Sequence, residues 1–176
     1  NRDTVRALDV CCGSGCIGIS FMLCRRAEGH EKDMVTLLDI SQDAVTLADT
    51  NNRQLQADCR VIQSDLFSNV EGRYNIIMSN PPYIRHDDIS DLMEEVRDFE
   101  PWLALDGGAS GLDFYDRIIR KAGDYLYDEG ELLFEIGYDQ FEDIRRLLVD
   151  AGYTDIACIK DYAELDRIVT ARWMNR

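Results

Sequence analysis

Short apolar runs alternate along this chain with longer stretches in which apolar residues recur every three or four positions. The apolar runs predict seven strands, at residues 5–10, 33–39, 60–63, 74–79, 131–136, 154–160 and 166–173. The longer stretches predict helices at residues 15–26, 42–55, 112–127 and 139–150. Strands that alternate with helices form a parallel sheet with helices on both faces, so the predicted fold class is α/β. Only residues 161–165 separate the last two strands, which predicts that the final strand enters as an antiparallel hairpin.

Length and charge restrict the class of protein. A chain of 176 residues is expected to form one domain, spanning residues 1–176. It begins without a methionine, which suggests a trimmed start, and no leader or run of roughly 18 apolar residues is present, so we expect a cytoplasmic protein without a membrane partner. The 34 acidic and 19 basic residues give a net charge of −15, which argues against direct binding of nucleic acid.

The cysteines and histidines do not predict a metal site. The six cysteines have no paired Cys-x-x-Cys spacing, and the chain contains only two histidines. We therefore expect small reduced thiols packed in the interior and no metal.

The first predicted strand runs into the sequence "LDVCCGSGCIG", residues 8–18, which places Gly13 and Gly15 between a strand and a helix. Glycines in this position allow backbone N–H groups and the helix N-terminus to approach a ligand closely. The same spacing, extended to Gly18, also fits the fingerprint of a nicotinamide dehydrogenase, so the loop alone does not decide the ligand.

Acidic residues follow the next two predicted strands. Asp39 is placed to accept hydrogen bonds from ribose hydroxyls, or else to cap the helix that follows it. Asp65 could accept from an adenine amino group, with Leu66 lining the ring, or could simply form a turn. Ligands of such sheets bind at the carboxyl ends of the strands, so the sequence predicts a pocket for an adenosine-containing cofactor there.

The fourth predicted strand ends in the sequence "NPPY", residues 80–83. Two adjacent prolines remove two backbone donors and hold the preceding asparagine in an extended conformation. The segment therefore presents a side-chain amide, carbonyls with no neighbouring N–H to bond them, and an aromatic ring at fixed angles. A proline pair can also merely end a strand.

The order of glycine loop, two acidic residues and Asn-Pro-Pro-Tyr resembles the class I S-adenosylmethionine-dependent methyltransferases. Within that class, the segments at residues 99–119, 133–140 and 160–172 are similar to the release-factor glutamine methyltransferase family, so the similarity spans nearly the whole chain. The resemblance implies a Rossmann-like, mostly parallel seven-stranded sheet with an antiparallel last strand. It also implies a helical N-terminal substrate domain that this chain lacks.

The resemblance implies methyl transfer from S-adenosylmethionine to the side-chain nitrogen of a glutamine in the Gly-Gly-Gln motif of peptide chain release factors, with S-adenosylhomocysteine as product. A ribosomal protein or adenine N6 in nucleic acid is the alternative acceptor, and a silent cofactor-binding module the alternative from another class. We expect a monomer with a protein substrate.

The implied cofactor-binding residues are Cys11, Cys12, Gly13, Ser14, Gly15, Asp39, Asp65, Leu66 and Asn80. The implied substrate-binding residues are Asn80, Pro81, Pro82 and Tyr83. Cys11 departs from the family, which has glycine there.

An amide acceptor demands positioning, because its nitrogen is a poor nucleophile. We expect the Asn80 side-chain oxygen and the Pro81 carbonyl to accept the two N–H groups of the substrate amide, and Tyr83 to pack over its plane. These three residues are the predicted catalytic residues, although Tyr83 could also be purely structural. The acidic residues at 87–98 follow directly and are either a solvated face or a contact for a basic protein loop.

Overall fold

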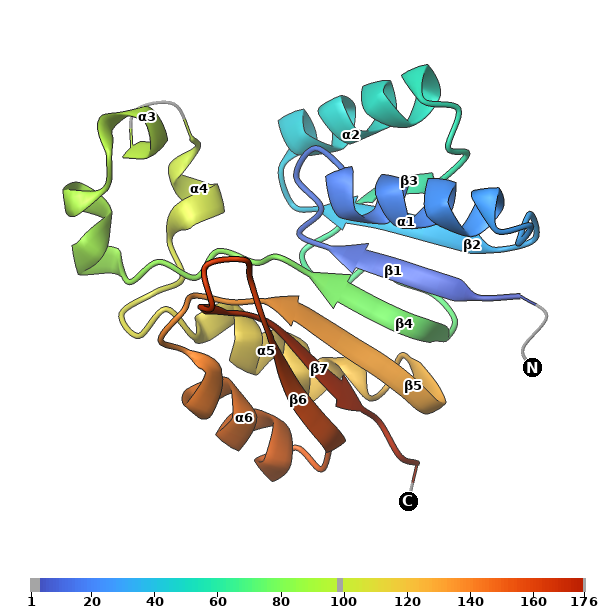
Figure 1. Ribbon diagram of the computed structural model, residues 1–176. Helices are drawn as coiled ribbons and strands as arrows, with labels where there is room; N and C mark the ends of the chain where they lie inside the picture. Colours follow the sequence, from blue (N-terminus) through green and yellow to red (C-terminus); the bar gives the residue numbers. More distant parts are fainter. Residues whose placement is uncertain (1–3, 98–99, 176) are drawn as a thin grey trace.

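The computed structural model describes residues 4–97 and 100–175, and its centre is one seven-stranded sheet in the order β3-β2-β1-β4-β5-β7-β6 (Figure 1). The first five strands pair in parallel, whereas β7 is antiparallel to both of its neighbours, β5 and β6. The predicted α/β class and the antiparallel entry of the final strand are confirmed. The strands are β1 (Arg6–Val10), β2 (Met34–Asp39), β3 (Arg60–Gln63), β4 (Tyr74–Ser79), β5 (Leu126–Glu135), β6 (Thr154–Lys160) and β7 (Asp166–Arg172).

Helices cover both faces of the sheet (Figure 1). Alternate residues of a strand point to opposite faces, so β1 contributes Ala7 to one hydrophobic cluster and Leu8 to the other. Ile19 belongs to the first cluster and Tyr115 to the second, so the two clusters bury the apolar sides of different helices. The long helices are α1 (Cys16–Ala27), α2 (Gln42–Gln54), α5 (Asp113–Ala122) and α6 (Phe141–Asp150).

The helix predicted at residues 112–127 was wrong beyond Ala122. Gly123 ends the helix under the ring of Trp173, where an added Cβ would lie 2.7 Å from a ring carbon. From Leu126 onward the backbone pairs with β4, beginning opposite Tyr74, so the strand predicted at 131–136 starts earlier and is longer. Tertiary pairing therefore outweighs the local helical pattern here.

Within the 86–106 segment, the described residues 86–97 and 100–106 carry three short helices that project from the carboxyl edge of the sheet (Figure 1). Its base is closed by two backbone bonds, from Ile84 N to Leu105 O at 3.0 Å and from Gly107 N to Ile84 O at 2.9 Å. The last residue of the acidic run 87–98, and the first of the family-like segment 99–119, lie outside the described residues. The short helices are η1 (His86–Asp91), α3 (Glu94–Arg97) and α4 (Trp102–Leu105). Within the described residues, no helix has the length and apolar character needed to cross a membrane.

Candidate active site

The register of the sheet brings four strand ends to one edge. Val10 of β1 pairs with Leu38 of β2 on one side and with Ser79 of β4 on the other. Asp39, at the end of β2, pairs with Gln63 at the end of β3. From β1 the chain adds β2 and β3 on one side, and it then crosses back to place β4 on the other side of β1. In α/β sheets, a crevice outside the carboxyl ends of the strands forms at such a switch point.

The glycine loop turns sharply between β1 and α1. Gly13 and Gly15 have positive φ angles of 52° and 79°, which glycine adopts without strain. A Cβ on Gly13 would meet no atom within 4 Å, so the space beside this residue is open. Cys11 adopts the same left-handed conformation, with φ at 59°, at the position where the resemblance implies a glycine. The departure at Cys11 therefore leaves the loop turned, at a conformational cost of roughly 1–2 kcal/mol.

Burial also decides the chemical state of Cys11. Its side chain packs against the hydrophobic core, and burial, with the charges of Asp39 and Asp9, raises the pKa of its thiol to about 12. A neutral thiol is a poor nucleophile, so Cys11 contributes shape to the loop and not reactivity.

Asp39 joins the end of β2 to the glycine loop. Its Oδ2 accepts from Gly13 N at 3.0 Å, and its Oδ1 accepts from Ser41 N at 2.9 Å. Ser41 itself caps α2, since its Oγ accepts from Ala44 N at 3.3 Å. The capping role considered for Asp39 thus belongs to Ser41, while each Asp39 oxygen keeps a lone pair for a ligand.

The third strand end presents Asp65 and Leu66. The Asp65 carboxylate accepts a hydrogen bond from Arg117 of α5 at 2.9 Å, and both side chains are about half exposed. Leu66 is buried and has a positive φ of 46°. The two residues border a cavity of about 410 Å³ between this loop and α5, so an apolar surface and an acceptor do lie side by side.

At the fourth strand end the Asn80 side chain is exposed and makes no hydrogen bond to any described residue. Pro81 and Pro82 are buried, and no described backbone N–H bonds to the Pro81 carbonyl. Ser79 ties this end to β1, because its Oγ donates to Val10 O at 2.7 Å. The site thus offers an unpaired amide and a free carbonyl on a fixed backbone.

Tyr83 lies partly buried against the core. Burial is the main cause that raises the pKa of its phenol, and the charge of Glu135 adds to this effect. The hydroxyl is therefore neutral and cannot serve as a base near neutral pH.

Two residues at this edge were not predicted from the sequence. Asp9 is fully buried in β1, where its Oδ2 accepts from Gly18 N at 2.8 Å and its Oδ1 has no partner. Burial raises its pKa to about 7, although the Gly18 bond opposes the shift. Ile40 follows Asp39 and is 47 % exposed, so it presents an apolar side chain at this edge. In the sequence, Asp9 could have been noticed as an acidic residue within an apolar run, and Ile40 as an apolar residue directly after a strand.

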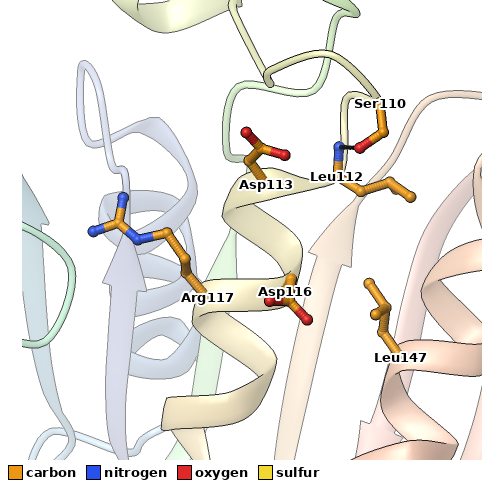
Figure 2. A pocket seen from close by; sticks show the side chains of 6 residues that line it. All are labelled: Ser110, Leu112, Asp113, Asp116, Arg117 and Leu147. Atoms are coloured by element: carbon orange, nitrogen blue, oxygen red, sulfur yellow. Dashed lines mark hydrogen bonds between the residues drawn. The ribbon is translucent and has the colours of Figure 1, made fainter.

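A larger cavity, of about 460 Å³, lies between α5 and α6 and contains none of the predicted site residues (Figure 2). Asp113 and Asp116 line it from α5, and Leu147 lines it from α6 (Figure 2). The predicted site residues lie instead at the strand ends, where Asp65 and Leu66 border the smaller cavity. Among residues 4–97 and 100–175 no three His, Cys, Asp or Glu side chains are grouped to hold a metal ion. All six cysteines are free, but Cys16 and Cys24 are exposed, so the prediction that the thiols pack in the interior was wrong for these two.

The sequence of this chain is similar to those of known proteins. Residues 1–97 match the family model described as the methyltransferase small domain. A release factor glutamine methyltransferase of Clostridium botulinum is 38 % identical over 98 % of this chain, and a ribosomal protein uL3 glutamine methyltransferase of Francisella tularensis is 42 % identical over 79 %. The chain spans only 61 % and 43 % of these two relatives.

The fold also matches solved structures. A methyltransferase from Pyrococcus furiosus aligns with a TM-score of 0.70 at 17 % identity, over 98 % of this chain and 76 % of that protein. This likeness confirms the predicted class I methyltransferase architecture of the sheet and its helices.

Proposed function

Because this chain belongs to the methyltransferase small-domain family, we propose that it methylates the side-chain nitrogen of a glutamine in a protein, in the Gly-Gly-Gln motif of peptide chain release factors. The observation that carries the proposal is the exposed, unpaired amide of Asn80 on a proline-fixed backbone, beside the glycine loop of β1. A planar amide is recognised by acceptors held at fixed angles, which is what this segment provides.

The residues at the strand ends fit S-adenosylmethionine as the cofactor, with S-adenosylhomocysteine as product. Gly13 has open space beside it, Asp39 keeps lone pairs for ribose hydroxyls, and Ile40 offers an apolar face next to it. The first turn of α1 contains no acidic residue, so its N-terminus suits a carboxylate. We assign the remaining contacts to Cys11, Cys12, Ser14, Gly15, Asp65, Leu66 and Asn80.

The cofactor supplies an electrophilic methyl group, and the residues of the chain orient the acceptor. Asn80 Oδ1 and the Pro81 carbonyl accept the two N–H groups of the glutamine amide, which turns the third face of its nitrogen towards the methyl group. These bonds would strengthen as positive charge develops on nitrogen, so they stabilise the transition state selectively. The nitrogen–methyl bond would form as the sulfur–methyl bond breaks, S-adenosylhomocysteine would leave, and the surplus amide proton would pass to water as the product separates. Tyr83 packs over the amide plane and excludes water.

A ribosomal protein is the second candidate substrate, because the relative from Francisella tularensis is named for one. Nucleic acid is disfavoured as an acceptor by the net charge of −15. We place the reaction in the cytoplasm, where release factors act, with the enzyme as a monomer.

Transfer of label from S-adenosylmethionine to purified substrates tests the proposal. A release factor, ribosomal protein uL3 and DNA are incubated separately with the chain, and the labelled residue is located by mass spectrometry. We expect label on the glutamine of the Gly-Gly-Gln motif and none on a release factor in which that glutamine is alanine. Label on DNA alone, or on another residue type, would refute the glutamine assignment.

A further inference from the structure

Gln140 is a buried polar residue that lies next to the 80–83 segment but takes no part in the site described above. It precedes α6, and its side chain is only 3 % exposed. Its Nε2 donates to Tyr83 O at 3.0 Å and to Gly111 O at 3.2 Å, while its Oε1 accepts from Gly137 N at 2.9 Å. Both donors and one acceptor of the amide are thus used, by three different parts of the chain.

The surrounding backbone is shaped to admit this amide. A Cβ on Gly111 would lie 2.5 Å from Tyr83 O and 2.8 Å from Gln140 Nε2. A Cβ on Gly137 would lie 2.8 Å from Gln140 Oε1. Only residues without a side chain allow the three backbone segments to close around the amide at these distances.

The 80–83 segment has few other means of attachment. Pro81 and Pro82 have no N–H, so neither can donate a backbone hydrogen bond to a neighbouring segment. The fixed points on either side are the bond from Ser79 Oγ to Val10 O and the bond from Ile84 N to Leu105 O. Between them, the Tyr83 carbonyl is held by Gln140.

We infer that Gln140 is a positioning residue for methyl transfer: through the Tyr83 carbonyl it fixes the height and tilt of the 80–83 segment. The inference rests on the proposed function for its kinetic consequence. Gln140 touches no reacting atom, so its loss should misplace the acceptors without removing them. A displacement of about 1 Å can cost about 10²-fold in rate.

The test replaces Gln140 by Met, which has a similar unbranched shape and no hydrogen-bonding amide. The matched control is Asn52→Leu. Asn52 is also a buried amide, with Oδ1 accepting from Cys59 N at 2.8 Å and Nδ2 donating to Cys59 O at 2.9 Å, but it lies towards the amino ends of the strands. Both variants should lose stability, and both are assayed at a temperature where they remain folded.

We expect Gln140→Met to lower the single-turnover rate about 10- to 100-fold, with cofactor affinity and substrate KM within about threefold of wild type. Asn52→Leu should retain the wild-type rate within about twofold. Equal rate losses in the two variants, or a rate for Gln140→Met within twofold of wild type, would overturn the inference.

Hydrogen exchange supplies a readout that does not depend on activity. The amides of Ile84 and Gly107 are bonded at the end of the 80–83 segment and report on its anchoring. Their protection should fall in Gln140→Met and persist in Asn52→Leu, and unchanged protection in both would reject the positioning role. A wild-type chain that methylates no glutamine would count against the proposed function, while the exchange data would still decide the role of Gln140.

Discussion

Asn80 is the residue whose removal should affect the chemistry most directly. Asn80→Ala deletes an acceptor where charge develops and leaves Gly13 and Asp39 intact, so kcat should fall by about 10²-fold or more. Cofactor affinity should change much less. Asn80→Asp keeps an acceptor oxygen and should retain more activity than Ala. Single-turnover kinetics with saturating cofactor measures these rates, and an Ala variant within a few-fold of wild type would remove Asn80 from the proposed role.

Asp9 should make the stability of the fold depend on pH. Burial raises its pKa to about 7 in the folded state, against about 3.9 in an unfolded chain, so the folded state binds the proton more tightly. This contribution is complete below about pH 4 and is lost as the pH rises through 7. Asp9→Asn cannot ionise. Between pH 5 and pH 8, wild type should therefore lose about 2–3 kcal/mol of unfolding free energy relative to the variant.

Urea unfolding of the two proteins at pH 5 and pH 8 checks this prediction. Other carboxylates are common to both proteins and cancel in the difference. A difference that stays constant between the two pH values would show that the Asp9 carboxyl titrates alike in the folded and unfolded states.

At the level of residues, the sequence was informative where a local motif is sufficient. Gly13 and Gly15 turn the chain by their own backbone preferences, and the two prolines fix the conformation before them. Asp9 and Gln140 differ, because their importance lies in contacts with Gly18, Tyr83 and Gly111 that arise only after folding. No residue spacing in the sequence predicts those contacts.

At the level of elements, substitution of Gly123 tests whether local helix propensity or tertiary packing decides where α5 ends. If the helix continued to residue 127, Gly123→Ala would stabilise it by about 1 kcal/mol. The structure places the added Cβ 2.7 Å from the Trp173 ring, so the substitution should instead destabilise the protein by about 1–3 kcal/mol. Thermal or urea unfolding of the variant measures the sign.

A double-mutant cycle with Trp173→Leu provides the control. Without the ring, the same Gly123→Ala change should become neutral or slightly stabilising. If Gly123→Ala has the same effect with and without Trp173, the overlap with the ring is not its cause.

The elements that were predicted well are those with strong internal patterns. The strands at residues 60–63, 74–79 and 154–160 were predicted with their observed ends, and most of the other elements differ by one or two residues at an end. The order β5-β7-β6 was only partly predicted. The sequence indicated that the final strand forms an antiparallel hairpin, but it did not indicate that this strand lies between β5 and β6. The start of β5 was missed because residues 125–127 continue a helical spacing while pairing with Tyr74 decides their conformation.

For the whole molecule, the net charge of −15 predicts that a basic protein substrate binds more weakly as salt rises. Glu94 and Glu95 are exposed in the segment that follows the site. Changing both to Gln should raise KM about two- to fivefold at low salt, leave kcat unchanged and reduce the salt dependence. Glu31→Gln with Glu71→Gln removes the same charge near the amino ends of β2 and β4.

Steady-state kinetics at several salt concentrations compares the two double variants. The control pair should alter KM much less than the pair near the site. Equal changes would indicate that only total charge matters and that the 86–106 segment has no special part in attracting the substrate.

The place of β7 in the sheet bears on how the protein is made. This strand is the last of the seven to be translated, yet it lies between β5 and β6, which do not pair with each other. Until it leaves the ribosome, β5 keeps an open edge and β6 has no neighbour, and such edges are prone to aggregation. A message truncated just before this strand would thus yield a product that contains all the predicted site residues but has an unfinished sheet, which makes it a target for cellular quality control.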